Sequence, residues 1–272
     1  MLEIDIFFII SLLLLFTGFI SGILAGFFGI GGGIIIVPVI YHLFNFLDFS
    51  QNISMHMAIG TSLATIIPAS LNSVIEHKKR SCVDISLLNK WKYTVLFGSL
   101  IGAVLAQLIE GKILIICFAF FSFLVAIRMF FNKPYSNKTY NFLKSIQKII
   151  SFLIGTVSSL LGIGGGTLSV PLLLSCGRNI KIAVGTSSGI GFFISLPATI
   201  IFLLAGLGVE NKPQYSVGFI SIIPFFLITL GTFFSVPMGV KIIHNFNNIL
   251  IKRFFCVLLL ISAIKMLRNL IV

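Results

Sequence analysis

The sequence predicts an all-α polytopic membrane protein built from two inverted-topology repeats, with discontinuous or re-entrant helices at two glycine motifs. Three observations lead to this fold class. Hydrophobic residues make up 57% of the chain and charged residues only 10%, which leaves too few polar side chains to cover a soluble surface. The chain divides into about 8–10 apolar segments, and one glycine-rich stretch occurs twice.

The apolar segments follow one another along the whole chain. They cover residues 6–28, 33–47, 54–75, 93–109, 113–131, 149–161, 167–176, 182–206, 216–239 and 249–268. A helix that crosses a bilayer needs about 20 apolar residues, and four of these segments are well short of that length. The two segments beside the second glycine motif are too short to span singly, so we expect half-helices meeting at membrane depth or a re-entrant hairpin.

The glycine-rich stretch is the clearest sign of an internal repeat. The first copy is residues 29–33 (GIGGG) followed by Pro38, and the second is residues 162–166 (GIGGG) followed by Pro171. Both copies sit between apolar segments in the same relative position. Further along, the residues AIGTS at 58–62 correspond to AVGTS at 183–187. The chain is therefore expected to consist of two homologous halves.

These correspondences define three parts of the chain. We predict a first transmembrane repeat over residues 1–131, a basic cytoplasmic connector over 132–148 and a second transmembrane repeat over 149–272. Each half holds about five apolar segments, or three and a hairpin. Either number is odd, so the second half enters the membrane from the opposite side and the repeats are inverted.

Basic residues concentrate in two loops. One loop carries Lys78, Lys79, Arg80, Lys90 and Lys92, and the connector carries Lys133, Lys138, Lys144 and Lys148. Basic loops stay in the cytoplasm, which places the acidic N-terminus (Glu3, Asp5) and the C-terminus outside. The net charge of +12 is attributed to loop anchors at the lipid bilayer and not to a nucleic-acid partner. The apolar N-terminal run lacks a small-residue cleavage site and is expected to stay in the mature structure.

Consecutive glycines inside a membrane are costly, because each weakens a helix by about 1 kcal/mol and frees backbone groups that lipid cannot satisfy. We therefore expect them to bind a ligand. Backbone N–H groups at a helix start, with the positive end of the helix dipole behind them, form an anion site without a cationic side chain. The candidate substrate-binding residues are Gly29, Gly31, Gly32, Gly33, Thr61, Ser62, Gly162, Gly164, Gly165, Gly166, Thr186 and Ser187.

Packing is the alternative role for many of the glycines. Gly18, Gly22 and Gly26 recur at every fourth residue, as do Gly98, Gly102 and Ala106. Such small-residue ridges let membrane helices approach closely. The threonine and serine hydroxyls also have an ordinary alternative, which is a hydrogen bond to their own helix.

The remaining polar residues narrow the chemistry. The acidic residues fall near segment ends, which disfavours cation binding and a carboxylate proton relay. His56 and His77 are candidate proton-coupling residues, with helix ends at the interface as the alternative. Arg178 and Lys181 could steer an anion or simply anchor a loop. The four cysteines have no metal-ligand spacing, and no soluble nucleotide motif or catalytic set is present, so neither a cofactor nor an enzyme activity is expected.

The doubled GIGGG motif, the stretch AIGTSL leading to EHKKR (residues 76–80) and the closing AIKM resemble the TauE/SafE family over essentially the whole chain. One departure is Ser81-Cys82, where the family pattern leads us to expect a glycine after the basic run. The resemblance implies a sulfite exporter or a permease for sulfonates and related sulfur-containing anions, in the bacterial inner membrane. The sulfur chemistry comes from the resemblance alone.

The sequence thus predicts a secondary transporter of small anions that works by alternating access at the repeat interface. Protons are the candidate coupling ion. The alternative is a non-transporting assembly or scaffold protein whose glycine motifs serve packing only. The substrate, the direction of transport and the oligomeric state are left open.

Overall fold

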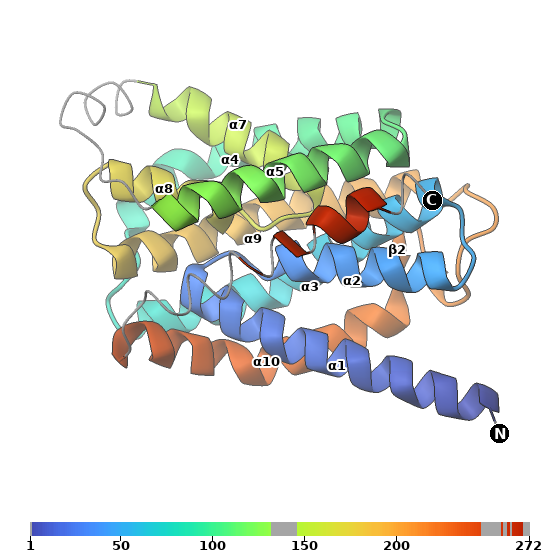
Figure 1. Cartoon of the computed structure of the whole chain (residues 1–272). Coiled ribbons are helices and arrows are strands. Elements are labelled where there is room, and N and C mark those ends of the chain that lie inside the picture. Colours follow the sequence, from blue (N-terminus) through green and yellow to red (C-terminus); the bar gives the residue numbers. More distant parts are fainter. Residues whose placement is uncertain (1, 132–145, 246–256, 258–259, 262, 269–272) are drawn as a thin grey trace.

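The computed structural model describes residues 2–131, 146–245, 257, 260–261 and 263–268. Its helices lie alongside one another in a bundle (Figure 1). The elements are α1 (Leu2–Phe28), α2 (Gly33–Phe46), α3 (Gln51–Lys78), α4 (Ile85–Leu108), α5 (Gly111–Phe131), α7 (Gln147–Leu161), α8 (Gly166–Ser175), α9 (Ile180–Ala205), β1 (Ser216–Val217), β2 (Ile220–Ser221) and α10 (Ile222–Asn245). Within the described ranges, five helices are long and apolar enough to cross a membrane: α1, α3, α4, α9 and α10. The prediction of an all-α polytopic membrane protein is confirmed.

Most of the expected apolar segments coincide with helices, and one of them begins with a short hairpin. Residues 216–221 begin the segment expected at 216–239, yet they form a short antiparallel hairpin in which Ser216 pairs with Ser221. Gly218, with a φ of 58°, turns this hairpin, and α10 begins only at Ile222. The apolar segment expected at 216–239 therefore consists of a short hairpin followed by a helix. Most of the connector and part of the segment at 249–268 lie outside the described residues.

Side-chain caps set the start of three helices. Asp84 accepts a hydrogen bond from the Leu87 N–H (3.0 Å), which starts α4 eight residues before the apolar run at 93–109. Ser50 caps α3 and Asn179 caps α9 in the same way. Each cap satisfies a backbone donor that the first turn of a helix leaves unpaired.

Both glycine motifs interrupt a helix at the place that the sequence predicts. The chain leaves α1 at Phe28 and enters α2 at Gly33, and it leaves α7 at Leu161 and enters α8 at Gly166. Figure 1 shows the chain reversing its direction between α1 and α2. α2 has 14 residues and α8 has 10, so at 1.5 Å per residue each falls short of the roughly 30 Å hydrocarbon core.

The small-residue ridges bring two pairs of helices together in parallel. Along α1 and α10, a Cβ added at Gly18 would meet Ile228 and one added at Gly26 would meet Val236. Along α4 and α7, Gly98 faces Phe152 and Gly102 faces Thr156 in the same fashion. The packing role of these ridges is confirmed, because a side chain at any of these positions would collide with the partner's backbone.

The matched central helices α3 and α9 pack antiparallel. Gly60, near the start of α3, lies against Phe202 near the end of α9, with an added Cβ 3.2 Å from the Phe202 ring. Gly185, near the start of α9, lies against His77 at the end of α3, with an added Cβ 2.9 Å from the His77 Cβ. Antiparallel packing of two corresponding helices is what inverted repeats require, although their orientation in a membrane stays a prediction.

The two ends of the bundle differ in charge. One end carries Lys79, Arg80, Lys90, Lys148 and Arg178, in segments that touch through an Arg178–Asp84 ion pair of 2.7 Å. The opposite end carries the loop acids Asp48, Glu110 and Glu210. We call the first the basic end.

Candidate functional site

The two glycine motifs meet in the buried centre of the bundle. A Cβ added at Gly164 would collide with the Ile30 carbonyl oxygen and would lie only 3.2 Å from Gly31 Cα. All the motif glycines are buried, and Ile30 and Ile163 lie with them in the apolar core. The two motifs are thus in direct contact in the fold.

Close approach explains why glycine is needed on both sides. A Cβ at Gly33 would collide with the Gly162 carbonyl, and a Cβ at Gly166 would collide with the Gly29 carbonyl. These two contacts are equivalent, because Gly33 corresponds to Gly166 and Gly162 corresponds to Gly29 in the two copies of the motif. Gly32 adds a conformational reason, because it precedes α2 with a φ of 83° that L side chains rarely adopt.

The carbonyls of the motifs are held by serines of the opposite half. The Ser62 hydroxyl on α3 donates to the Gly162 carbonyl (2.8 Å), and the Ser187 hydroxyl on α9 donates to the Gly29 carbonyl (3.1 Å). These bonds form another pair related by exchange of the halves. Both hydroxyls therefore orient the motifs, and neither donor is left over in this arrangement.

The two threonines beside these serines bind backbone N–H groups of the opposite half. Thr61 Oγ1 accepts from the Ser221 N–H (3.0 Å), and Thr186 Oγ1 accepts from the Asp84 N–H (2.9 Å). A threonine hydroxyl that accepts one bond still has its own proton to donate. The four hydroxyls that the sequence singles out thus all lie at the contact between the halves.

Several motif carbonyls have partners, and the N–H groups of Gly29, Gly162 and Ile163 bind carbonyls of the preceding helix, but the N–H groups of the later glycines do not. Among the described residues, no hydrogen bond uses the N–H of Gly31, Gly32 or Gly33, or that of Gly164, Gly165 or Gly166. These donors stand at the starts of α2 and α8, where the helix dipoles carry partial positive charge. The arrangement can bind an anion, since a buried unpaired N–H costs about 1–3 kcal/mol until an acceptor reaches it.

A row of hydroxyls on α3 includes Ser62, but its other members were not part of the predicted site. Ser62, Thr65, Ser70 and Ser73 follow one face of the helix, and none is more than 1% exposed. Ser73 Oγ lies 2.8 Å from Ser188 Oγ on α9. The helical spacing of these residues was a readable signal, but small hydroxyls on apolar helices are too common for that signal to stand out.

Ser70 is the member of this row with an unused hydroxyl. Its Oγ has no hydrogen-bond partner among the described residues. It lies 3.0 Å from the position of a Cβ added at Gly191, and the Gly191 N–H lies 3.5 Å from one added at Gly165. Ser70 therefore stands near the unpaired N–H groups of the second motif.

Both candidate coupling histidines are buried and bind carbonyl oxygens. His77 Nε2 lies 2.9 Å from the Gly26 carbonyl, three residues before the first motif. His56 Nδ1 lies 2.8 Å from the Asn52 carbonyl, and its Nε2 lies 3.0 Å from the Ala106 carbonyl. A neutral imidazole donates through only one nitrogen, so protonation of His56 would satisfy both contacts.

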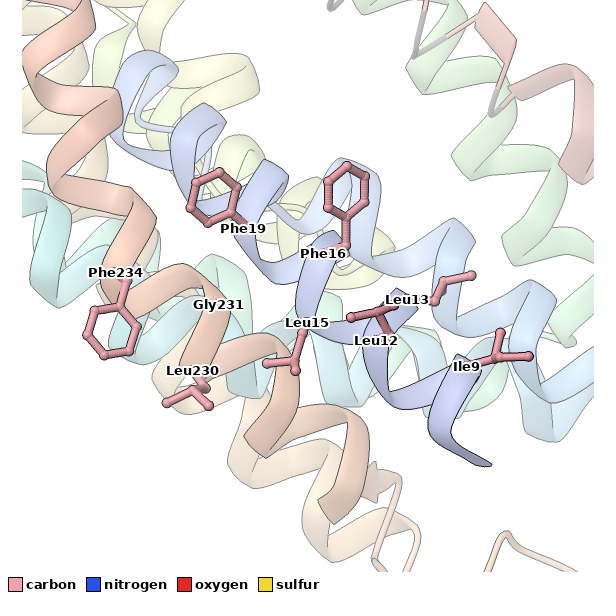
Figure 2. Close-up of a pocket in the computed structure, with 9 residues that line it drawn as sticks. All are labelled: Ile9, Leu12, Leu13, Leu15, Phe16, Phe19, Leu230, Gly231 and Phe234. Carbon is pink, nitrogen blue, oxygen red and sulfur yellow. The ribbon is translucent and has the colours of Figure 1, made fainter. Parts of the chain in front are cut away.

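Two cavities among the described residues lie away from the motifs. One, of about 700 Å³, lies between α1 and α10 and is lined by apolar residues and Gly231, among them Phe16, Phe19 and Phe234 (Figure 2). It offers no polar group for an anion and has the character of a lipid-facing surface. The other lies at the basic end and includes Lys90 and Arg178. In the part of the chain that the structure describes, no cluster of three or more potential metal ligands occurs.

Comparison with known proteins gives a consistent result. The family model described as Sulfite exporter TauE/SafE matches residues 14–266. A probable membrane transporter protein of Haemophilus influenzae is 31% identical over 256 residues, which are 94% of this chain and 97% of the relative. A probable membrane transporter protein of Methanocaldococcus jannaschii is 28% identical over 245 residues, 85% of each chain. The Arabidopsis thaliana protein named Sulfite exporter TauE/SafE family protein 6 is 31% identical over 117 residues, 43% of this chain and 26% of the relative. No solved structure matches the chain.

Proposed function

Because the chain belongs to the sulfite exporter TauE/SafE family of membrane transporters, we propose that it is a secondary transporter of small anions. The proposed substrate is sulfite, an organosulfonate or a related sulfur-containing anion. The substrate class is supported by the family description and by the name of the Arabidopsis thaliana relative. The observation that carries the anion site is the set of unpaired N–H groups where the two motifs meet.

The proposed binding site uses the backbone of both motifs. Gly31, Gly32 and Gly33 supply N–H groups at the start of α2, and Gly164, Gly165 and Gly166 supply them at the start of α8. A single anion between two helix starts gains from both dipoles without a buried lysine or arginine. The Ser70 hydroxyl is a further donor on this side.

The proposed transport mechanism is alternating access at the contact between inverted repeats. This proposal is supported by equivalent contacts in the two halves. Ser62 and Ser187 occupy corresponding positions, and each binds a carbonyl of the glycine motif in the opposite half. If the two halves rock about this contact, an opening toward one side has an equivalent opening toward the other. The proposed location is the bacterial inner membrane with the N-terminus outside.

Protons are the proposed coupling ion, with His56 and His77 as the groups that carry them. His56 has two carbonyl partners and so gains a hydrogen bond on protonation. His77 binds the last turn of α1 just before the first motif. A change of charge at either residue would act on helices that lead directly to the anion site.

One observation favours the alternative of a scaffold without transport. The motif glycines are buried against each other, and neither of the two cavities described above reaches them. Packing alone would require glycine at Gly33, Gly164 and Gly166, where a Cβ collides with backbone. It would not require their N–H groups, and this difference separates the two functions.

Gly165 provides the test, because proline there removes one N–H while the backbone conformation suits proline. Its φ is −56°, close to the value of about −65° that proline imposes. A Cβ at this position would lie 2.6 Å from the flexible end of Ile194 and 3.1 Å from the Ile190 side chain, while the nearest backbone atom, Gly191 N, is 3.5 Å away. In proteoliposomes, Gly165→Pro is expected to lower sulfite flux by about tenfold or more, the loss expected for one charge-assisted hydrogen bond.

The matched control is Gly165→Ala, which adds the same Cβ but keeps the N–H and is expected to retain most of the flux. Sulfate, taurine and thiosulfate as competitors, each with and without a pH gradient, would identify the anion and the coupling. Equal flux in the proline and alanine variants would rule out the role of this N–H. If inserted wild-type protein moved no sulfur anion, the scaffold alternative would be preferred.

A further inference from the structure

A second polar site lies at the basic end of the bundle. A cavity of about 430 Å³ is lined by Ser86, Leu87 and Lys90 of α4, Gln147 of α7, and residues 176–178 of the loop after α8. α4 belongs to the first half of the chain, whereas α7 and the loop belong to the second. The cavity therefore lies on the contact between the halves, and we call it the basic-end cavity.

The electrostatics of this cavity favour an anion. Lys90 and Arg178 contribute two cations, and none of the lining residues is acidic. The nearest carboxylate, that of Asp84, already binds Arg178 (2.7 Å) and caps the Leu87 N–H (3.0 Å). Arg178 can share its fork of donors between Asp84 and a second acceptor.

The start of α4 adds backbone donors to the wall. Ser86 and Leu87 belong to the first turn of this helix, whose N–H groups carry the positive end of the dipole. The Leu87 N–H is taken by Asp84, and no hydrogen bond among the described residues uses the Ser86 N–H. The Cys176 thiol does not oppose an anion, because burial raises the pKa of this thiol, although Arg178 acts in the opposite direction.

The basic-end cavity is connected to the motif junction through two hydrogen bonds. Asp84, which binds Arg178, donates its N–H to Thr186 Oγ1 (2.9 Å). The next residue, Ser187, donates to the Gly29 carbonyl of the first motif (3.1 Å). An anion that draws Arg178 away from Asp84 would therefore act on a residue that binds Thr186, the neighbour of the serine that holds the first motif.

We propose that the basic-end cavity binds a small oxyanion group, with Lys90, Arg178 and the Ser86 N–H as its donors, and that this is the point where the anion enters from the basic side. Binding of the oxyanion is inferred from the cavity alone. Only its role as the entry point rests on the proposed transport function. The shared chemistry is a tetrahedral or pyramidal oxyanion, which a free sulfate or sulfonate and a lipid phosphate can all supply.

Trp91 is a built-in reporter for this site. It is the single tryptophan of the sequence and is 1% exposed. Its Nε1 donates to Gln147 Oε1 (3.4 Å), and Gln147 lines the cavity. Binding that moves Gln147 or changes the local field is therefore expected to change tryptophan emission.

The experiment titrates full-length protein in uncharged detergent with sodium sulfate at constant ionic strength, with chloride as the replacing anion. Wild-type Trp91 emission is expected to change in a saturable way. Lys90→Gln is expected to raise the half-saturating sulfate concentration about tenfold, because one charge-assisted contact is lost. Lys92→Gln is the matched control: its Nζ lies 4.9 Å from the Tyr93 ring, it does not line the cavity, and no shift is expected.

A second arm adds phosphatidylglycerol to the micelles. If sulfate still changes Trp91 emission in the presence of the lipid, the occupant is the soluble anion. If the lipid itself changes the emission and abolishes the response to sulfate, and this effect again depends on Lys90, the occupant is the lipid phosphate. A flat titration with both ligands, or equal shifts in Lys90→Gln and Lys92→Gln, overturns the site. Binding without flux in proteoliposomes would reject the proposed transport function and leave this site standing, whereas flux with a flat titration would do the reverse.

Discussion

At the residue scale, the serine bonds to the motif carbonyls are what hold the two halves in register. Ser62 and Ser187 each cross from one half to a glycine carbonyl of the other, at 2.8 Å and 3.1 Å. Both serines are fully buried. A buried carbonyl that loses its only side-chain donor has no water to replace it, so these hydroxyls are expected to contribute to stability as well as to geometry.

We expect Ser62→Ala and Ser187→Ala each to lower the free energy of unfolding in detergent by about 1–3 kcal/mol, the cost of leaving a buried acceptor unpaired. The two losses should be similar, because the contacts correspond to each other. The control is Ser11→Ala, since the Ser11 hydroxyl bonds only its own helix (Phe7 carbonyl, 2.9 Å). A loss at Ser62 no larger than that at Ser11 would contradict this role.

The motif residues could be identified from the sequence because consecutive glycines are anomalous in a membrane helix. The partners of Ser62 and Ser187 could not, since each bond joins residues at least 100 positions apart and depends on how the helices pack. The Arg178–Asp84 pair could not be identified either, because it also depends on how the helices pack. Ser81 is explained only by the structure: its φ of 55° is the conformation that glycine usually supplies, which accounts for the glycine expected there.

At the element scale, the small-residue ridges determine which helices become neighbours. α1 packs along α10, and α4 packs along α7, through glycines that face the partner's backbone. Lipid is as apolar as a leucine side chain, so close van der Waals contact and not hydrophobic burial is what favours these pairs. A single larger side chain on a ridge therefore acts on the whole pair.

Gly102→Val is expected to separate α4 from α7, because the new side chain would collide with the Thr156 carbonyl and the Ser159 hydroxyl. Overpacking of this kind costs about 1–3 kcal/mol or more, and we expect a lower unfolding temperature in detergent. Gly208→Val is the matched control, since nothing lies within 4 Å of a Cβ there. Equal unfolding temperatures for the two variants would show that this ridge does not limit stability.

Helix positions were predictable within a few residues, because each apolar run must find a nonpolar environment along its length. The hairpin at 216–221 was not, because its residues are as apolar as the helix that follows. It depends on the turn at Gly218 and on the contact of Ser221 with Thr61. The early start of α4 depends on the Asp84 cap, which a search for apolar runs does not detect.

At the scale of the whole molecule, each of the main contacts between the two halves has a counterpart that joins the corresponding residues with the halves reversed. The pairing includes the motif glycines, the serine bonds and the threonine bonds, and the central helices α3 and α9 are antiparallel. The basic end gathers Lys79, Arg80 and Lys90, whereas Glu210 lies in the loop at the other end. Both features support inverted halves with the basic end in the cytoplasm.

Cysteine labelling tests this orientation. In a variant without native cysteines and expressed in a bacterial inner membrane, Gln214→Cys is expected to react with an impermeant maleimide in intact cells, and Lys79→Cys only in inside-out vesicles. Both positions are exposed and lie at opposite ends of the bundle. Reaction of both from the same side would contradict the predicted topology.

The parallel packing of α1 against α10 also has a consequence in time. α1 ends at Phe28, and α10 begins only at Ile222. At about 5–20 residues per second, the partner of α1 follows it by roughly 10–40 seconds. During that interval the ridge at Gly18, Gly22 and Gly26 faces lipid without its partner. The glycine ridge of α1 is therefore completed only when one of the later helices has been made.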